Sequence, residues 1–314
     1  MKRVLITAFA AALATVPSWG EWAYEGQWGS SGSGNGQFDR PNKVAVAPGG
    51  NIYVCDTSNA RIQYFTAVGS YLGKWGSRGS GNGEFSSPLG VAVGLGGNVY
   101  VADYWNHRIQ YFTGTGSFLG KWGSLGSGNG EFYCARDVAV AAGGNVYVAD
   151  IGNRRIQYFT ATGSFLGQWR TSIEAQCIAV APGGNVYATA PNMHRLAYYT
   201  SAGSFLGSWG TYGVNNGEFM GPLGVAVAPD ANVYVTEASG HRVQYFTATG
   251  SYLGRWGWIG SGNGEFYQPR GIAVTPAGSC VYVADSGNDR VQYFYWVEPA
   301  VAPSSLGRVK ALFR

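Results

Sequence analysis

Charged residues are scarce in this chain of 314 residues, since only 12% are Asp, Glu, Lys or Arg. The formal net charge is +4, but five of the 21 basic residues lie in the first three and the last seven positions. Residues 21–303 hold the other 16 basic residues and all 17 acidic ones, a net charge of −1. A nucleic-acid binder usually carries a strong basic excess on one face, so a nucleic-acid partner is not expected.

Residues that bind metals are also few. The four cysteines form no Cys-x-x-Cys pair, which argues against a structural zinc site (Cys55, Cys134, Cys177 and Cys280). The three histidines occupy one equivalent turn position in different repeats and are expected to be separated surface residues (His107, His194 and His241). No cofactor is predicted, although Ca²⁺ or Zn²⁺ in a central channel is left open. A disulfide between Cys134 and Cys177 is also left open, because both lie where neighbouring repeats begin and export would permit the bond.

Only one apolar run stands out, at residues 4–16, and no later run is long enough to cross a membrane. Lys2 and Arg3 precede this run and small residues follow it, which is the pattern of a secretory signal peptide. We therefore predict a signal peptide at 1–20 and an exported protein (periplasmic, cell-surface or secreted) without a transmembrane span after cleavage. Residues 298–314 form a linker and a short basic tail whose role the sequence does not indicate.

What the sequence does contain is a repeat. Arg-Ile/Val-Gln-Tyr-Phe begins at residues 61, 108, 155, 242 and 290, and a weaker copy, Arg-Leu-Ala-Tyr-Tyr, begins at 195. The spacing of 40–48 residues is typical of propellers and solenoids. Each copy contains four short runs rich in β-branched and aromatic residues, separated by turns with Gly, Asn and Ser. Four strands per copy predict the blades of an all-β propeller.

The two ends of the repeat region predict how the ring closes. Residues 24–29 match the fourth strand of a repeat but follow no first three strands, whereas the last copy has three strands and no fourth. The N-terminal strand is therefore expected to complete the last blade, which leaves no open sheet edge between first and last blades. We predict a six-bladed β-propeller of antiparallel four-stranded blades at 21–297.

Several motifs recur in the same order in most copies: Phe-x-x-Pro-x-Gly-Val-Ala-Val, Gly-Asn-Val-Tyr-Val-Ala-Asp, Asn-x-Arg-Ile-Gln-Tyr-Phe and Gly-Ser-Phe-Leu-Gly-x-Trp-Gly. In these motifs the chain resembles the NHL repeat family, over about residues 22–297. The resemblance implies a six-bladed propeller of an exported, bacterial type. It fixes the fold better than the activity, because one fold hosts many functions.

An acidic residue and an arginine flank the turn between the second and third strands in five copies. The carboxylate and the guanidinium can face each other across this hairpin. Repetition around the ring favours a structural pair over a binding site (Asp56/Arg61, Asp103/Arg108, Asp150/Arg155, Glu237/Arg242 and Asp285/Arg290). The fourth copy has Ala190 in the acidic position and lacks the glycine-rich loop that precedes the first strand elsewhere.

The residues at the start of each first strand, beside the channel, vary while the framework repeats. Variation on a fixed scaffold is what a specific site requires. The candidate ligand-binding residues at this channel mouth are Asn42, Lys43, Arg136, Asp137, Gln176 and Arg270. Their three cations favour an anionic group, with solvated rim charges as the alternative.

Three function classes remain. The sequence shows no nucleophile–base pair, which favours a non-enzymatic interaction platform for a protein, a glycan or a small ligand. Some NHL-like propellers are lyases that hold zinc through histidines at the first-strand starts, but no histidine stands at these positions here. A metal-dependent lyase or hydrolase, for example one that uses Asp137 with calcium, is therefore the disfavoured alternative. The third class is an architectural cell-surface protein.

Overall fold

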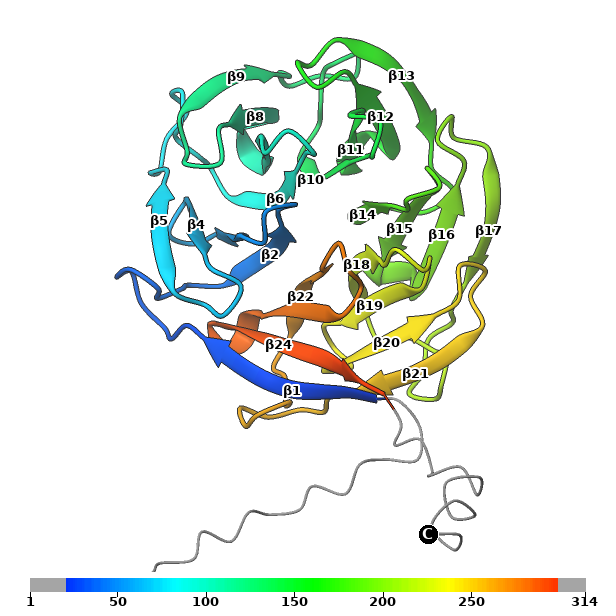
Figure 1. Ribbon diagram of the computed structural model, residues 1–314. Helices are drawn as coiled ribbons and strands as arrows, with labels where there is room; N and C mark the ends of the chain where they lie inside the picture. Colours follow the sequence, from blue (N-terminus) through cyan, green and yellow to red (C-terminus); the bar gives the residue numbers. More distant parts are fainter. Residues whose placement is uncertain (1–20, 299–314) are drawn as a thin grey trace, which may run out of the picture. The chain divides into compact units, whose positions relative to one another are not determined.

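The computed structural model describes residues 21–298 and consists almost entirely of β-strands (Figure 1). Six sheets of four antiparallel strands stand around a central axis. The prediction of an all-β six-bladed propeller is confirmed. The predicted signal peptide, and the tail beyond Glu298, lie outside the described residues. No helix among residues 21–298 is long and apolar enough to span a bilayer.

Each blade runs from an innermost first strand to an outermost fourth strand. Blade 1 has β2 (Pro41–Val46), β3 (Ile52–Asp56), β4 (Arg61–Phe65) and β5 (Tyr71–Trp75). Blade 2 has β6 (Pro88–Val93), β7 (Val99–Asp103), β8 (Arg108–Phe112) and β9 (Phe118–Trp122). Blade 3 has β10 (Ala135–Val140), β11 (Val146–Asp150), β12 (Arg155–Phe159) and β13 (Phe165–Arg170).

Blade 4 has β14 (Cys177–Val180), β15 (Val186–Ala190), β16 (Arg195–Tyr199) and β17 (Phe205–Trp209). Blade 5 has β18 (Pro222–Val227), β19 (Val233–Glu237), β20 (Arg242–Phe246) and β21 (Tyr252–Trp256). Blade 6 has β22 (Pro269–Val274), β23 (Cys280–Asp285), β24 (Arg290–Val297) and, outermost, β1 (Glu21–Trp28). Short 3-10 helices form four of the turns between second and third strands (η1, Tyr104–Asn106; η2, Ile151–Asn153; η3, Pro191–Met193; η4, Ser286–Asn288).

The sheet of blade 6 closes the ring as predicted, because β1 lies beside β24 in the order β1-β24-β23-β22. Residues 24–295 form the propeller unit. The described residues at the outer ends of these two strands, 21–23 and 296–298, belong to a second unit, in which Trp22 and Trp296 stack edge to face at 5.5 Å.

The pattern of burial explains why the strands differ in sequence. Every residue of β3, β7 and β11 is buried, and these strands read as continuous apolar runs that end in Asp. In the outermost strand β5, half-buried and exposed positions alternate, as expected for a strand with one face toward solvent.

Aromatic rings fill the space between neighbouring blades. The ring centroid of Trp28 in blade 6 lies 5.6 Å from that of Phe65 in blade 1. The ring centroid of Trp75 in blade 1 lies 5.5 Å from that of Phe112 in blade 2. Gly69, at φ +86°, packs under Trp28 so closely that a Cβ there would lie 2.6 Å from the indole. Full burial of a phenylalanine ring such as Phe65 or Phe112 contributes about 1.5–3 kcal/mol to stability. The recurring tryptophans therefore join the blades into one ring.

Candidate functional site

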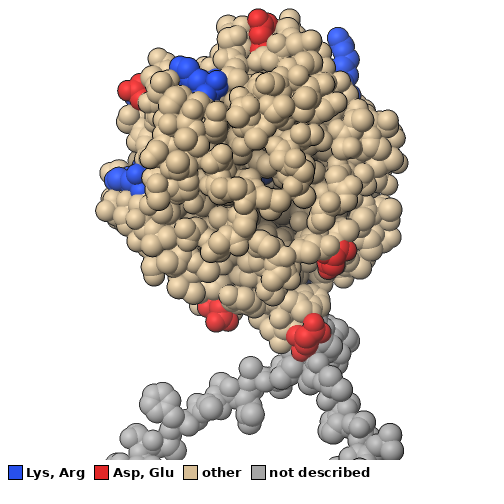
Figure 2. All heavy atoms as spheres, turned by 45° about the horizontal axis from the view of Figure 1, so that its top comes forward, with Lys and Arg blue, Asp and Glu red and all other residues tan. Residues whose placement is uncertain are grey.

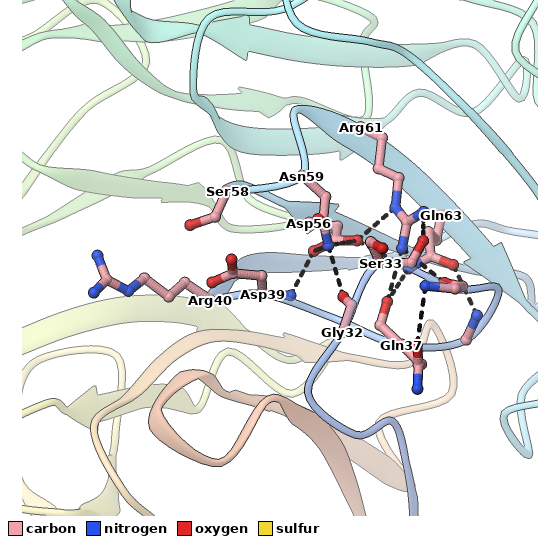
Figure 3. A network of polar contacts seen from close by, with 12 residues as sticks. Gly32, Ser33, Gln37, Asp39, Arg40, Asp56, Ser58, Asn59, Arg61 and Gln63 are labelled. Carbon is pink, nitrogen blue, oxygen red and sulfur yellow. Dashed lines mark hydrogen bonds and ion pairs between the residues drawn. The ribbon is translucent and has the colours of Figure 1, made fainter.

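A polar network holds the glycine-rich loop of each regular blade, and blade 1 shows its geometry (Figure 3). Arg61 Nε donates to Asp56 Oδ2 at 2.6 Å. The other guanidinium nitrogens donate to loop carbonyls, Nη1 to Ser33 O at 2.6 Å and Nη2 to Gly34 O at 2.8 Å and Gln37 O at 2.9 Å. The arginine therefore satisfies both the buried carboxylate and the backbone of the crossover loop.

The five predicted acid–arginine pairs all have this contact, and all ten side chains are buried. The distances from Arg Nε to the carboxylate oxygen are 2.6 Å (Asp56–Arg61), 2.8 Å (Asp103–Arg108), 2.7 Å (Asp150–Arg155), 2.5 Å (Glu237–Arg242) and 2.7 Å (Asp285–Arg290). The same buried contact occurs in all five blades, which supports a structural role for these pairs and argues against ligand binding.

The glutamine of the repeat signature belongs to the same network, a role that the sequence analysis did not assign. Gln63 Nε2 donates to Gln37 O at 2.6 Å, and its Oε1 accepts from Gly36 N at 3.0 Å. Its signal in the sequence is that this glutamine accompanies the acidic residue and the long loop in the same five copies.

Blade 4 has lost the whole network together. Ala190 replaces the acid, Ala197 replaces the glutamine, and Arg195 is exposed. In place of the glycine loop, a short connection buries Ile173 and Ala175 in the core between blades 3 and 4. In blade 4, apolar packing therefore takes the place of the polar network that holds the loop in the other blades.

The three histidines lie in hairpin turns and are partly exposed, and they also link consecutive blades, a contact that the sequence analysis did not assign. Each is partly buried, and its Nδ1 accepts a hydrogen bond from a backbone amide at the start of the next blade. The distances are 3.0 Å (Cys134 N to His107), 3.2 Å (Gly221 N to His194) and 3.1 Å (Gln268 N to His241). Asp289 does the same for blades 6 and 1, accepting from Arg40 N at 2.8 Å. Among residues 21–298, no three His, Cys, Asp or Glu side chains gather closely enough to share a metal ion.

Acidification is expected to weaken the link at His241. Burial lowers the pKa of this imidazole from its ordinary value of 6.5, and a protonated Nδ1 cannot accept from Gln268 N. The unfolded chain takes up the proton at a higher pH than the folded one does. Stability therefore falls as the pH decreases through about 6.5.

Melting temperatures at about pH 8 and about pH 5 test this effect. The matched variant is His241→Asp, because Asp289 shows that an aspartate can accept the same amide bond. The loss between the two pH values should be smaller in this variant than in the wild type. Equal losses in the two proteins would contradict a role for His241.

The six first strands contact one another around the axis and line the channel. Taken in order, the positions at the channel mouth hold an amide, a leucine and an arginine, twice (Asn42, Leu89, Arg136, Gln176, Leu223 and Arg270). Blades 1–3 therefore match blades 4–6. The residues at the channel mouth therefore repeat with an approximate twofold symmetry around the ring axis.

Lys43 does not stand free at this mouth. Its Nζ lies 2.7 Å from Asp137 Oδ2, and both side chains are buried. The pair joins β2 to β10 past Gly90 of the blade between, where a Cβ would lie 2.6 Å from Asp137 Oδ1. Burial alone would lower the pKa of Lys43, but the charge of Asp137 raises it overall. The carboxylate that the calcium hypothesis requires is thus already matched by a cation.

Arg136 and Arg270 are the candidate residues whose charge is not matched. Both are half-buried, and the Nε of each is enclosed without a partner among residues 21–298. Asn42, in the amide orientation that satisfies both of its polar atoms, accepts from Arg270 Nη1 at 3.1 Å and donates to Leu89 O at 3.2 Å. Burial, and then the positive charge of Arg136, lower the pKa of Arg270.

The cysteines offer no nucleophile at this site. All four are free and buried, so Cys134 and Cys177 form no disulfide. Burial raises the pKa of the Cys177 thiol to about 11 even though Lys43, Arg136 and Arg270 oppose the shift. A thiol with such a pKa stays protonated near neutral pH.

The far ends of the first strands line an apolar cavity of about 330 Å³. Valines of five blades contribute to its wall (Val93, Val140, Val180, Val227 and Val274). Figure 2 shows that charged side chains are few and scattered on one face, which is hollowed near the middle of the ring. The channel thus has a polar end, where the strands begin, and an apolar end.

Two segments, residues 38–65 and 85–112, match the family model of the NHL repeat. Each segment spans the first three strands of a blade, and the structure extends that unit around a closed ring of six. The chain is an NHL-repeat β-propeller. Among curated proteins, none matches its sequence significantly.

Solved structures resemble this NHL propeller in fold. A protein of unknown function from Bacteroides thetaiotaomicron has a TM-score of 0.70 at 16% identity, with 87% of this chain and 76% of that chain covered. The virginiamycin B lyase from Staphylococcus aureus has a TM-score of 0.60 at 12% identity (88% and 99% covered). A streptogramin B lyase has 0.59 at 12% (89% and 98%). At these identities the likeness concerns the fold alone.

Proposed function

We propose that this NHL propeller is an exported, non-enzymatic platform that binds a protein, a glycan or a small ligand at the channel mouth. The candidate residues are Asn42, Lys43, Arg136, Asp137, Gln176 and Arg270. One observation carries the proposal. Among residues 21–298, Arg136 and Arg270 each keep an enclosed Nε–H without a partner, whereas the fully buried cations are all paired.

Within this proposal the Lys43–Asp137 pair is the floor of the site. Buried hydrogen-bond donors without partners are costly, so their presence at the mouth supports a ligand that accepts from them. The lyase alternative has less support, because the mouth positions contain no histidine and Asp137 is paired with Lys43.

Affinity capture from the cell-surface extract of the source organism tests the proposal, with the mature protein as bait. We expect a specific partner that the wild type retains and the Arg136→Gln/Arg270→Gln variant loses. The control is Lys74→Gln/Lys121→Gln, which makes the same change in net charge at exposed positions of β5 and β9. Capture of no partner, together with a stoichiometric metal, would point to an enzyme instead. Self-association alone would favour an architectural protein.

A further inference from the structure

Blades 3 and 6 share a local sequence that no other blade has. Phe132–Arg136 and Phe266–Arg270 both read Phe-Tyr-x-x-Arg, with an exposed tyrosine three residues before the channel-mouth arginine. In the other blades with this loop, the tyrosine position holds Asp39, Ser86 or Met220. These two blades lie opposite each other in the ring of six.

Each tyrosine is held in the same way. Tyr133 stacks on His107 of the preceding blade, at 6.0 Å between ring centroids and an interplanar angle of 14°. Tyr267 stacks on His241 at 5.5 Å and 3°. The two blades thus fix the segment before the arginine through the same partner.

The turn beneath each tyrosine is adapted to it. Gly152 and Gly287 lie so close to Tyr133 and Tyr267 that a Cβ on either would collide with the tyrosine ring. Their amides donate to the tyrosine carbonyls, at 2.9 Å and 2.7 Å. The four other blades have larger residues at this turn position (Ser58, Trp105, Asn192 and Ser239). The same combination of a tyrosine, a glycine beneath it, a stacked histidine and a channel-mouth arginine therefore occurs in blade 3 and again in blade 6.

The two arginines that these segments position have no acidic partner. None of the ion pairs among residues 21–298 includes Arg136 or Arg270. Burial, and then the positive charge of Arg136, lower the pKa of Arg270, and the Nε of each arginine is enclosed. Two half-buried cations that repel each other are unfavourable, and an anion between them would offset the repulsion.

We propose that one oxyanion, a carboxylate, phosphate or sulfate group, binds on the channel axis between Arg136 and Arg270. The planar fork of a guanidinium matches such groups through paired N–H···O bonds. Asn42 orients Arg270 from one side. The inference rests on the proposed function and gives the chemistry of its ligand. The oxyanion is either a free small anion or the acidic group of a sugar.

Calorimetric titration of the mature protein tests the site, with inorganic phosphate, glucuronate and neutral glucose as probes. We expect one anion per chain and no binding of glucose. Arg136→Gln and Arg270→Gln should each weaken anion binding about tenfold or more, because each removes charge-assisted hydrogen bonds. The Lys74→Gln/Lys121→Gln control should bind as the wild type does. Tighter binding of glucuronate than of phosphate would identify the sugar acid as the source, and the reverse a free anion.

Thermal unfolding provides a second readout. Phosphate or glucuronate should raise the melting temperature of the wild type and of the lysine control, and should leave the double arginine variant unchanged. No anion binding by the wild type, two anions per chain, or binding that persists in the double variant would overturn the site.

The two proposals can fail separately. A partner captured equally by the wild type and by the double arginine variant, without anion binding, would overturn the oxyanion site and leave a binding platform at another surface. Anion binding that depends on both arginines, with no partner captured, would support the site and exclude a protein or glycan partner, which would leave a small anion as the ligand of the proposed function.

Discussion

Replacing Asp137 with alanine is expected to lower the free energy of unfolding by about 3–5 kcal/mol. The substitution leaves Lys43 buried on the channel axis without the carboxylate that lies 2.7 Å from its Nζ. It also removes the acceptor of the Ile178 amide, which donates to the same oxygen at 2.9 Å. A stranded buried charge costs far more than the loss of an exposed ion pair.

Chemical denaturation measures this loss, with Glu25→Ala on the exposed face of β1 as the control. Adding Lys43→Met to Asp137→Ala should restore more than half of the lost stability, because no buried charge then remains without a partner. If Asp137→Ala cost no more than Glu25→Ala, the ammonium group of Lys43 would have to reach solvent, which would contradict a pair that is buried from solvent.

Replacing Arg108 with methionine should cost a similar amount, about 3–5 kcal/mol. Asp103 would lose its partner at 2.8 Å and stay buried. The carbonyls of Ser80, Gly81 and Glu84 would lose the donors that hold the loop of residues 76–85. Blade 4 supplies a matched control, because Arg195 occupies the same repeat position without an acid, a loop or burial.

Arg195→Met should therefore change the free energy of unfolding by no more than about 0.5 kcal/mol. Limited proteolysis provides the second measurement. We expect new cleavage within residues 76–85 in Arg108→Met and none in Arg195→Met. Equal destabilisation by the two substitutions would show that the arginine acts through general packing and not through the network.

The fold was predictable because repetition multiplies a weak signal. A single Arg-Ile-Gln-Tyr-Phe segment identifies only a strand, whereas six copies and an offset fourth strand specify the number of blades and the closure by β1. The pairing of Asp56 with Arg61 is local, since the two residues flank one hairpin. Contacts of this kind follow from spacing alone.

The site was less predictable, because its contacts join blades. Lys43 and Asp137 are 94 positions apart and come from blades that are not neighbours. The repeat pattern predicts that Lys43 and Asp137 both lie at the channel, but it does not predict which side chains form contacts across the channel. The link from His241 to the next blade depends on the left-handed conformation at φ 52°, which aims the imidazole at Gln268. The matching of blades 3 and 6 is visible in the sequence only after the mouth positions are ordered around the ring.

The closure of blade 6 has a consequence for synthesis. Gln27 of β1 and Arg290 of β24 are joined by a hydrogen bond of 2.7 Å across a separation of 263 positions. A ribosome releases β1 first and its partner strand last, so the first strand made waits through nearly the whole translation of the domain. Nascent chains that stop early hold an unpaired strand edge and an unfinished sixth blade. Truncated chains therefore expose a strand edge that the finished chain covers with β24.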